Sequence, residues 1–271
     1  MKELVTIKEH LKNPKVSVIV TTFNREVLLK ETIDSILKQT FKDFELIVVD
    51  NFSEYDFLAS MSQYDDFRIR IYQNQNDGVI AANRNFGIKK AKGEFLAFCD
   101  DDDLWHPTKL EKQFKYIIEE NADLVHTNMY VFQDSPDKII NQTKSKEYTK
   151  LSQLIQNNQI YTSTVMVRGK EVKFPEDAAM FAVEDYSLWL KLLSNNKRFK
   201  LHKEPLVYYR LNPTNTSKKY WATKHIKNIY VLSQLLIAGK SKKSITVVYS
   251  INVVKHIILL LIKKLVQKFK I

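Results

Sequence analysis

The sequence predicts an α/β fold in which a mostly parallel sheet is covered by helices on both faces. Short continuous apolar runs, rich in β-branched residues, alternate along the chain with segments whose apolar residues have helical spacing. Most of these runs lack the polar alternation of a half-exposed sheet, and continuous apolar strands are typical of a parallel sheet that is buried on both faces. With 271 residues, of which 44% are apolar, the chain is large enough to bury such a sheet.

The first part of the chain supplies the predicted parallel strands and their connecting helices. Continuous apolar runs at residues 16–20 and 46–49 predict buried strands, and the alternating run at residues 68–72 predicts a third strand. The first run leads into a polar turn, where Asn24 is the expected N-cap of a helix. A second helix is expected over about residues 81–92. Neither a G-x-G-x-x-G nor a Walker A pattern occurs, which excludes the familiar phosphate loops.

Four consecutive carboxylates, Asp100 to Asp103, follow directly on the apolar run 95–99. Adjacent like charges repel one another, and burial would cost each of them free energy or raise its pKa. A bound cation would remove that difficulty, and oxygen ligands suit a hard divalent ion such as Mg²⁺ or Mn²⁺. The alternative is a solvated acidic turn, since runs of like charge are usually solvated. The position after a buried strand favours a metal site, because ligands of open α/β sheets bind beyond the carboxyl ends of the strands.

The chain beyond the acidic run continues with further helices and strands. A helix is expected after Pro107, and residues 135–150 are polar enough to predict a mobile loop. Further strands are expected at residues 124–132, 164–167 and 206–210. Glu184 and Asp185 precede an apolar pattern with helical spacing, so we expect them in the first turn of a helix.

The basic charge of the chain is concentrated at its C-terminal end. The formal net charge is +11, yet no Asp or Glu occurs after Glu204, whereas residues 205–271 contain thirteen Lys or Arg. Residues 1–204 carry 29 basic and 31 acidic side chains, so their net charge is −2. An asymmetry of this kind points to an anionic partner, either nucleic acid or a membrane surface.

The residues from about 220 onward predict two helices that break near Gly239. The second helix, over residues 244–271, is basic and amphipathic, and its longest unbroken apolar run has six residues. Because a helix needs about 20 apolar residues to cross a bilayer, we expect this segment to lie in the interface of an anionic membrane. The alternatives are a helix that packs on its own domain or on a second subunit, and a nucleic-acid-binding segment, for which no recognised motif is present.

Two features indicate the cytoplasmic side of the membrane. Cys99 is the single cysteine, which excludes an intramolecular disulfide and fits a reducing compartment. The N-terminal residues are charged and lack the apolar core of a secretory signal. We therefore expect a cytoplasmic protein that is held peripherally at the inner face of the plasma membrane.

Several short motifs occur in an order that is typical of one enzyme family. They are the segments 18–25 (VIVTTFNR), 48–51 (VVDN), 83–87 (NRNFG), 98–105 (FCDDDDLW), 183–190 (VEDYSLWL) and 205–210 (PLVYYR). In these motifs the sequence resembles the family 2 glycosyltransferases, nucleotide-sugar-dependent enzymes with the Rossmann-like GT-A fold. The resemblance implies a GT-A domain over residues 1–217 and a basic helical tail over residues 218–271. The chain departs from the family after the second strand, where Asp50 is followed by Asn51 instead of a second acid.

The resemblance implies a nucleotide site at the ends of the first two strands. Thr21 and Phe23 would border the nucleotide, and Asp50 would accept hydrogen bonds from its base. Phe23 is able to stack on a nucleobase, which is worth about 1–3 kcal/mol, and the alternative for Thr21 and Phe23 is ordinary packing in a turn. Arg84 would pair with a phosphate, or else with an acidic side chain on a helix face.

The resemblance also assigns roles to the four acids. Asp100 and Asp102 match the Asp-x-Asp motif of the family. Asp102 would ligate Mn²⁺ or Mg²⁺ with Asp103 supporting the metal site, whereas Asp100 would contact the nucleotide sugar or the waters of the metal. Asp101 is expected beside Asp100 in the nucleotide-sugar site. A divalent ion stabilises the charge on the departing diphosphate, and it does so most in the transition state.

Asp185 is the implied general base, which takes the proton of the acceptor hydroxyl as that hydroxyl attacks the anomeric carbon. Glu184, Trp105 and Arg210 are implied to support the donor or the acceptor. The structural alternative for Glu184 and Asp185 is that acids stabilise the start of a helix.

These expectations describe an inverting glycosyltransferase of the hexosyltransferase type. It would move a sugar from a nucleotide diphosphate, expected to be a UDP-sugar, to a hydroxyl of a glycan or lipid-linked glycan in polysaccharide biosynthesis. The expected partners are the donor, the acceptor and an anionic membrane surface bound by residues 244–271, without nucleic acid. The alternatives are a sugar nucleotidyltransferase, which usually has a glycine-rich basic loop after its first strand, and a non-catalytic module that binds membrane or nucleic acid.

Overall fold

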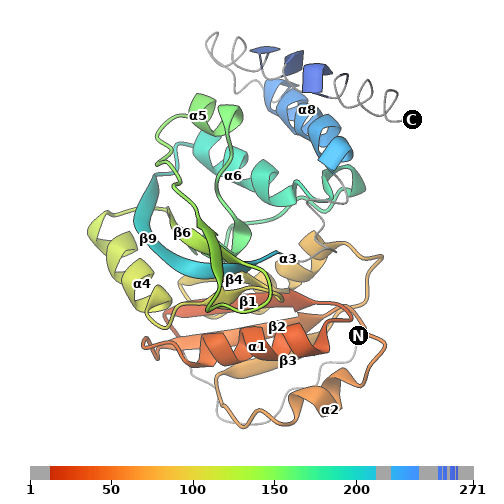
Figure 1. The fold of residues 1–271 in the computed structure, drawn as a ribbon, viewed down its shortest axis with the longest axis vertical. Helices are drawn as coiled ribbons and strands as arrows, with labels where there is room; N and C mark the ends of the chain where they lie inside the picture. The colour runs from red at the N-terminus through yellow and green to blue at the C-terminus, as the bar shows by residue number, and fades with distance from the viewer. Residues whose placement is uncertain are drawn as a thin grey trace.

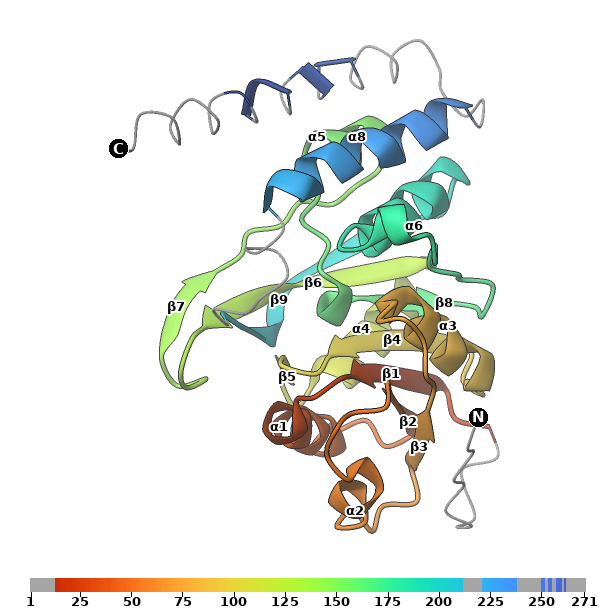
Figure 2. The same ribbon diagram turned by 90° about the vertical axis from the view of Figure 1, so that its right-hand side faces the viewer.

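The computed structural model describes residues 13–211, 221–237, 250–251, 253–254, 257–259 and 261. Over this part of the chain, nine strands form one sheet in the order β3-β2-β1-β4-β8-β6-β9-β5, and β7 pairs with β6 beside that path. Helices lie on both sides of the sheet (Figures 1 and 2). The predicted α/β fold is therefore confirmed.

One half of the sheet is parallel and comes from the N-terminal part of the chain. Its strands, in sheet order, are β3 (Ile69–Gln73), β2 (Phe44–Asp50), β1 (Val16–Thr22) and β4 (Phe95–Asp100). All neighbours in this half run parallel to one another. The connections carry the helices α1 (Glu26–Leu37), α2 (Phe57–Met61) and α3 (Ile80–Lys90).

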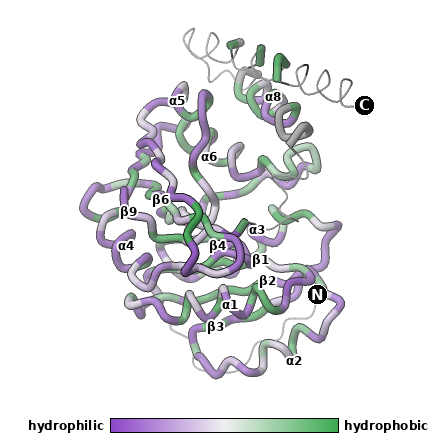
Figure 3. The backbone as a smooth tube through the Cα atoms, viewed as in Figure 1, coloured by the Kyte–Doolittle hydropathy of each residue, from purple (hydrophilic) through white to green (hydrophobic). Residues whose placement is uncertain are grey.

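Successive side chains of β1 bury against helices on opposite sides of the sheet. Val18 packs in one core cluster with Ile33 of α1. Ile19 packs in the other cluster with Ile88 of α3. Both faces are buried in this way because the side chains of a strand alternate between the two faces. α1 alternates hydrophobic and hydrophilic residues along its length, as a helix with one buried face does (Figure 3).

The other half of the sheet combines both strand directions. Its strands are β5 (Leu104–Trp105), β6 (Leu124–Phe132), β7 (Ile139–Gln142), β8 (Met166–Arg168) and β9 (Phe199–Arg210). β8 runs antiparallel to β4 and to β6, whereas β6 runs parallel to β9. The other elements are α4 (Lys109–Glu119), α5 (Leu151–Gln156), the 3₁₀ turns η1 (Thr162–Thr164) and η2 (Ala178–Met180), and α6 (Glu184–Ser194). The expectation of a mostly parallel sheet thus describes the N-terminal half alone.

The direction in which successive strands are added to the sheet switches between β1 and β4, which are neighbours in the sheet. After β1 the chain adds β2 and β3 on one side and then crosses to add β4 on the other side. Thr21 near the end of β1 lies opposite Asp100 at the end of β4. Ligands of open α/β sheets bind beyond the strand ends at such a switch in order. The fold therefore places the acidic run where a ligand site is expected.

The predicted N-cap of the first helix is wrong. α1 begins at Glu26 with Arg25 in the N-cap position, and Asn24 lies outside the helix with a left-handed φ of 53°. Asparagine tolerates this conformation better than most residues do. Its side-chain oxygen accepts a hydrogen bond from the backbone N–H of Glu54 at 2.7 Å, which joins the turns that follow β1 and β2.

Three further boundaries differ from the predictions. The loop expected over residues 135–150 contains β7, which pairs with β6 as a hairpin. The strand expected at 164–167 is shifted, because Thr164 belongs to η1 and β8 begins at Met166. β9 begins well before residue 206, since its N-terminal part pairs with β6.

The predicted C-terminal tail contributes one helix that packs on the domain. In α8 (Trp221–Ile237), Val231 and Leu232 are buried in the core cluster that also contains residues of α6. Lys227 Nζ donates a hydrogen bond to the carbonyl oxygen of Phe181 at 2.7 Å. Both views show α8 beside α6 (Figures 1 and 2).

Most of the second tail helix, predicted over residues 244–271, lies outside the described residues. Where the structure does describe this stretch, several apolar side chains are exposed, namely Ile251, Val254, Ile257, Ile258 and Leu261. No helix within the described ranges is long and apolar enough to cross a membrane. The division of the chain between residues 217 and 218 stays a prediction.

One lysine lies fully buried in the core of the domain. Lys109 Nζ lies 3.8 Å from the centre of the Trp105 ring and donates a hydrogen bond to Gln113 Oε1 at 2.6 Å. The amide nitrogen of Gln113 in turn donates to the carbonyl oxygens of Val125 and Thr164. Burial lowers the pKa of Lys109 from 10.5 to about 7, so the folded protein binds this proton more weakly than the unfolded chain does.

Lys109→Met should remove a pH dependence of stability that the native protein shows between pH 7 and pH 10.5. In this range the unfolded chain keeps the proton and the folded protein releases it. The free energy of unfolding of the native protein therefore rises with pH, by at most about 1.4 kcal/mol per pH unit. Methionine has a similar volume and does not titrate. Urea titrations across this range measure the difference, and Lys115→Met, at an exposed position of the same helix, is the matched control. Equal slopes for the native protein and Lys109→Met would contradict the prediction.

Candidate active site

The carboxylates at the end of β4 do not form a solvated turn. Asp101, Asp102 and Asp103 expose only 6%, 7% and 1% of their surface, whereas Asp100 is partly exposed. Buried like charges are stable only where cations or hydrogen-bond donors compensate them. The contacts around the four acids show how this chain meets that requirement.

Arg25, in the turn after β1, compensates two of these charges. Its Nη1 lies 2.9 Å from Asp101 Oδ1 and 3.0 Å from Asp102 Oδ2. Thr22, the last residue of β1, donates a hydrogen bond to Asp101 Oδ2 at 2.7 Å. Burial raises the pKa of Asp101, and the contacts with Arg25 and Thr22 oppose that rise. Both oxygens of Asp101 are therefore held by β1 and the turn that follows it.

Asp102 carries a charge that Arg25 offsets only in part. Burial, followed by the charges of Asp100 and Asp101, raises the pKa of Asp102 to about 6, while Arg25 acts against this rise. The negative charge of Asp102 is therefore not fully neutralised by Arg25, and a further cation beside this carboxylate would be stabilising.

Asp103 is held by the protein through both of its oxygens. Ser163 Oγ donates to Asp103 Oδ2 at 2.6 Å, and the backbone N–H of Arg210 donates to Asp103 Oδ1 at 3.1 Å. Burial and the charges of Asp102 and Asp100 raise the pKa of Asp103 well above its usual value. Asp103 therefore links η1 and β9 to the acidic run at the end of β4. The expected support of a metal site by Asp103 stays a prediction.

Arg84 on α3 joins the acids of β4 to the start of α6. Its guanidinium lies 2.8 Å from Asp100 Oδ1 and 2.8 Å from Glu184 Oε1. Burial by itself lowers the pKa of Arg84, but the two carboxylates raise it above its usual value. Of the two roles expected for Arg84, the structure shows the pairing with acidic side chains.

α6 begins where the sequence predicts, with Glu184 and Asp185 in its first turn. Asp185 is partly exposed, and its Oδ2 accepts a hydrogen bond from Thr162 Oγ1 at 3.3 Å. Glu184 is buried, and burial raises its pKa against the effect of Arg84. Glu184 Oε2 is buried without a hydrogen-bond partner among the residues that the structure describes. The two acids therefore face the end of β4 in different environments.

The turn η1 connects both sides of this site, although the sequence reasoning assigned it no role. Ser163 accepts a hydrogen bond from the backbone N–H of Asp100 at 3.0 Å and donates to Asp103, while its neighbour Thr162 donates to Asp185. Three consecutive hydroxyl residues at 162–164 were the available signal. Arg25 was also missed, although it lies inside the first family motif.

The expected nucleotide residues surround the ends of β1 and β2. Thr21 is buried opposite Asp100, whereas Phe23 is 49% exposed in the turn after β1. Asp50 is fully buried and accepts hydrogen bonds from Ser53 Oγ at 2.5 Å and from Gln73 Nε2 at 3.1 Å. These partners lock Asp50 in its local turn, so its predicted contact with a base stays a prediction.

Trp105 and Arg210, which the resemblance implied to support donor or acceptor, are both buried, and that role stays a prediction. The ring of Trp105 lies against Lys109 Nζ. Arg210 is also buried; its Nε donates to the carbonyl oxygen of Asp102 at 3.0 Å, and its Nη2 pairs with Glu31.

A metal ion would have to be held by few protein ligands. Within the described ranges, no three His, Cys, Asp or Glu side chains are arranged to hold a metal ion. Asp100 and Asp102 nevertheless present hard oxygen ligands, and the raised pKa of Asp102 reflects uncompensated negative charge. Two carboxylates fit an ion such as Mg²⁺, which commonly completes its coordination with water and phosphate oxygens.

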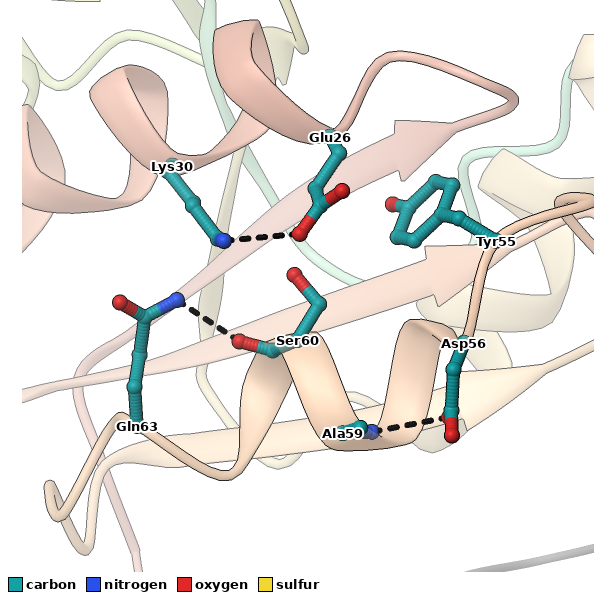
Figure 4. Close-up of a pocket in the computed structure, with 7 residues that line it drawn as sticks. All are labelled: Glu26, Lys30, Tyr55, Asp56, Ala59, Ser60 and Gln63. Atoms are coloured by element: carbon teal, nitrogen blue, oxygen red, sulfur yellow. Dashed lines mark hydrogen bonds and ion pairs between the residues drawn. The ribbon is translucent and has the colours of Figure 1, made fainter.

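A separate cavity of about 480 Å³ lies between α1 and α2 (Figure 4). It is lined by Glu26, Lys30, Tyr55, Asp56, Ala59, Ser60 and Gln63. The pair formed by Lys30 and Glu26, at 2.8 Å, crosses one of its walls. None of the acids described above lines this cavity, so it lies apart from the site at the end of β4.

A mixed α/β sheet with helices on both sides, and with carboxylates at its switch in strand order, resembles solved glycosyltransferases of the GT-A fold. The chain belongs to glycosyl transferase family 2, whose sequence profile matches residues 17–173, more than half of the chain.

Known relatives and structures agree with this family. An uncharacterized glycosyltransferase of Rickettsia felis is 37% identical over 73% of this chain, which spans only 33% of that protein. WfaP of Escherichia coli, a UDP-Glc:alpha-D-GlcNAc-diphosphoundecaprenol beta-1,3-glucosyltransferase, is 30% identical over 89% of this chain and 95% of its own length. The mannosyltransferase PcManGT from Pyrobaculum calidifontis, solved with GDP-Man and Mn²⁺, has a TM-score of 0.66 at 16% identity. That match covers 93% of this chain and 73% of that one, and it shows a shared fold.

Asp102→Asn should stabilise the protein at neutral pH when divalent ions are removed with EDTA. Folding raises the pKa of Asp102 from 3.8 to about 6, so the folded protein binds this proton more tightly than the unfolded chain. The native protein therefore loses stability as the pH rises through this range, and the asparagine variant avoids a loss of about 1–2 kcal/mol. Thermal unfolding at pH 4 and pH 7 measures the effect. Asp134→Asn, at an exposed position, is the control and should leave stability unchanged. A less stable Asp102→Asn at pH 7 would contradict this account.

Proposed function

We propose that the protein is an inverting glycosyltransferase that transfers a sugar from a UDP-sugar to a hydroxyl of a lipid-linked glycan. One observation carries the proposal: the Arg84 guanidinium lies between Asp100 and Glu184, 2.8 Å from an oxygen of each. The side chain of Arg84 therefore links the acids at the end of β4 to the first turn of α6, which contains Asp185. Sugar transfer requires a group that stabilises the leaving diphosphate and a base that takes the proton of the incoming alcohol, and both must lie near the anomeric carbon.

The donor would bind at the switch between β1 and β4. The exposed ring of Phe23 is available to stack on the base, and Thr21 and Asp50 lie at the adjoining strand ends. Asp100, the most exposed of the four acids, is the one that is able to reach the ribose or the diphosphate. The donor of WfaP is UDP-Glc, which supports a UDP-sugar in this related chain.

Asp102 and Asp100 would hold the Mn²⁺ or Mg²⁺ ion. When bound, such an ion stabilises the negative charge that develops on the departing diphosphate. The protein's own contribution is to orient the two carboxylates, because Arg25 holds one oxygen of Asp102 and Arg84 holds one oxygen of Asp100.

Asp185 would act as the general base. Its carboxylate takes the proton of the acceptor hydroxyl while the oxygen of that hydroxyl bonds to the anomeric carbon and the bond from this carbon to the diphosphate oxygen breaks. A single displacement of this kind inverts the anomeric configuration. Thr162 orients Asp185 by donating to Oδ2, and the backbone N–H of Tyr186 donates to Oδ1 at 2.6 Å.

The acceptor and the basic tail point to the membrane. WfaP acts on a sugar linked to diphosphoundecaprenol, and a related acceptor would be presented to this chain at the lipid surface. The lysines of residues 244–271 would hold the protein peripherally at the cytoplasmic face, because anionic lipids attract each nearby Lys or Arg by about 1 kcal/mol.

Asp185→Asn should lower kcat by a factor of about 10²–10⁴, because the amide cannot accept the proton of the acceptor. The KM for the UDP-sugar should change little, since the donor binds at the end of β4. The assay measures Mn²⁺-dependent release of UDP from a panel of nucleotide sugars, with an alkyl-diphosphate-linked N-acetylglucosamine as acceptor. Asp134→Asn is the matched control, and removal of the metal by EDTA should stop turnover by the native protein.

Native turnover that persists in Asp185→Asn would reject this residue as the base. Absence of transfer from every nucleotide sugar would reject the proposed function. Formation of a nucleotide sugar from a nucleoside triphosphate and a sugar 1-phosphate would instead identify a nucleotidyltransferase.

Replacing the five lysines of the predicted tail helix with glutamine should weaken binding to vesicles that contain phosphatidylglycerol. The positions are Lys255, Lys263, Lys264, Lys268 and Lys270. Each loss removes up to about 1 kcal/mol, so the fraction that sediments with vesicles should fall at least about tenfold. The control carries five exposed lysines of the domain changed in the same way, namely Lys89, Lys115, Lys138, Lys150 and Lys170. Equal sedimentation of the two variants would remove the membrane from the proposal.

A further inference from the structure

Two tyrosines form an aromatic pair beside the site, and the mechanism above does not use them. The ring centroids of Tyr161 and Tyr209 lie 5.8 Å apart, with an angle of 53° between the ring planes. Tyr161 precedes η1, and Tyr209 lies near the end of β9. Tyr161 is 39% exposed, although Ile160 before it and Thr162 after it are buried. The ring of Tyr161 is therefore accessible to a ligand, whereas its two neighbours in the chain are not.

Two hydrogen bonds to one carboxylate hold this pair in place. Ser163 donates to one oxygen of Asp103, and the backbone N–H of Arg210 donates to the other. Tyr161 lies two residues before Ser163, and Tyr209 directly precedes Arg210. The buried Asp103 therefore fixes both backbone segments, and with them the place where the two rings meet.

The pair also lies next to the proposed base. Thr162, the neighbour of Tyr161, donates a hydrogen bond to Asp185 Oδ2 at 3.3 Å. The pKa of the Tyr161 hydroxyl is raised, first by burial and then by the negative charge of Asp185. Both observations place the ring of Tyr161 within the electrostatic reach of the carboxylate that would receive the proton.

The two rings belong to the half of the sheet that does not hold the nucleotide. The proposed nucleotide residues end β1 and β2, in the parallel half, whereas η1 and β9 belong to the mixed half on the far side of β4. A substrate that touches Tyr161 would therefore lie beside Asp185 and apart from the strand ends proposed for the nucleotide. The acceptor is the substrate that has to reach Asp185.

We propose that Tyr161 and Tyr209 form a stacking platform for the pyranose ring of the acceptor sugar. The platform binds the C–H face of the ring and leaves a hydroxyl at the edge of the ring directed to Asp185. This inference rests on the proposed function and adds to it the residues and the chemistry that hold the acceptor.

The apolar faces of a pyranose ring are complementary to the faces of the two tyrosine rings. A pyranose with equatorial hydroxyls carries C–H bonds on its faces and polar groups around its edge. The face of a tyrosine ring is electronegative and apolar, so it attracts the C–H face and removes it from water. The hydroxyl groups at the edge remain free for hydrogen bonds, so their desolvation cost is small.

The test measures saccharide binding separately from catalysis. Saturation-transfer NMR titrations of the full-length protein use methyl β-D-glucopyranoside and methyl N-acetyl-α-D-glucosaminide, with UDP titrated in parallel as a check of the nucleotide site. Three variants are compared with the native protein: Tyr161→Leu, Tyr161→Phe and Tyr208→Leu. Tyr208 is the matched control, because it precedes Tyr209 on the same strand but stacks on Tyr130, at 5.3 Å between centroids.

Tyr161→Leu should raise the Kd of the preferred glycoside at least about fivefold, because the aromatic face is lost. Tyr161→Phe and Tyr208→Leu should bind that glycoside as the native protein does, and all three should bind UDP unchanged. With the alkyl-diphosphate-linked acceptor, Tyr161→Leu should raise the acceptor KM by a similar factor and leave the donor KM unaltered.

Equal glycoside affinity in the native protein and Tyr161→Leu would overturn the platform, and so would failure of the native protein to bind either glycoside. Loss of glycoside binding in Tyr161→Leu, together with absence of transfer from every nucleotide sugar, would support the platform and overturn the proposed function. The two hypotheses therefore fail by different measurements.

Discussion

The burial of adjacent carboxylates at the end of β4 is the constraint on which the rest of this structure depends. Like charges are stable away from water only when donors and cations surround them. The chain supplies Arg25 after β1, Arg84 on α3 and Ser163 in η1. Each partner comes from a different element. The acids therefore also fix the positions of these elements relative to the end of β4.

The negative charge of these acids is not fully compensated by the protein, and this residual charge lowers stability while it favours the binding of a cation. Asp101 and Asp103 have both oxygens held by the protein, whereas burial and then the charges of Asp100 and Asp101 raise the pKa of Asp102 to about 6. A folded protein gains nothing from such a surplus of charge on its own. A site proposed to bind a divalent cation would gain from this charge, because the cation neutralises it, and perturbed pKa values are common at functional sites.

The two halves of the sheet divide the chemistry between them. The parallel half ends in the acids and the exposed ring of Phe23, which suit a nucleotide. The mixed half brings η1 and β9 against the same acids, and these elements carry the hydroxyls and the aromatic pair next to Asp185. Asp103 lies at the junction, so one buried carboxylate joins the proposed donor side to the proposed acceptor side.

Local patterns in the sequence were enough to predict the parallel half, the acids at the end of β4 and the start of α6 at Glu184, because strand runs and helix starts are encoded by neighbouring residues. The same patterns could not show that Asp50 and Trp105 are buried, or that Arg84 pairs with Asp100 and Glu184. Nor could they assign roles to Arg25, Thr162 and Ser163, since Ser163 meets Asp103 across 60 residues and Arg210 meets it across 107. The sequence by itself determined which acids exist and which strand carries them. The tertiary structure alone decided which of them the protein satisfies and which remain open to a ligand, because that depends on how distant segments meet.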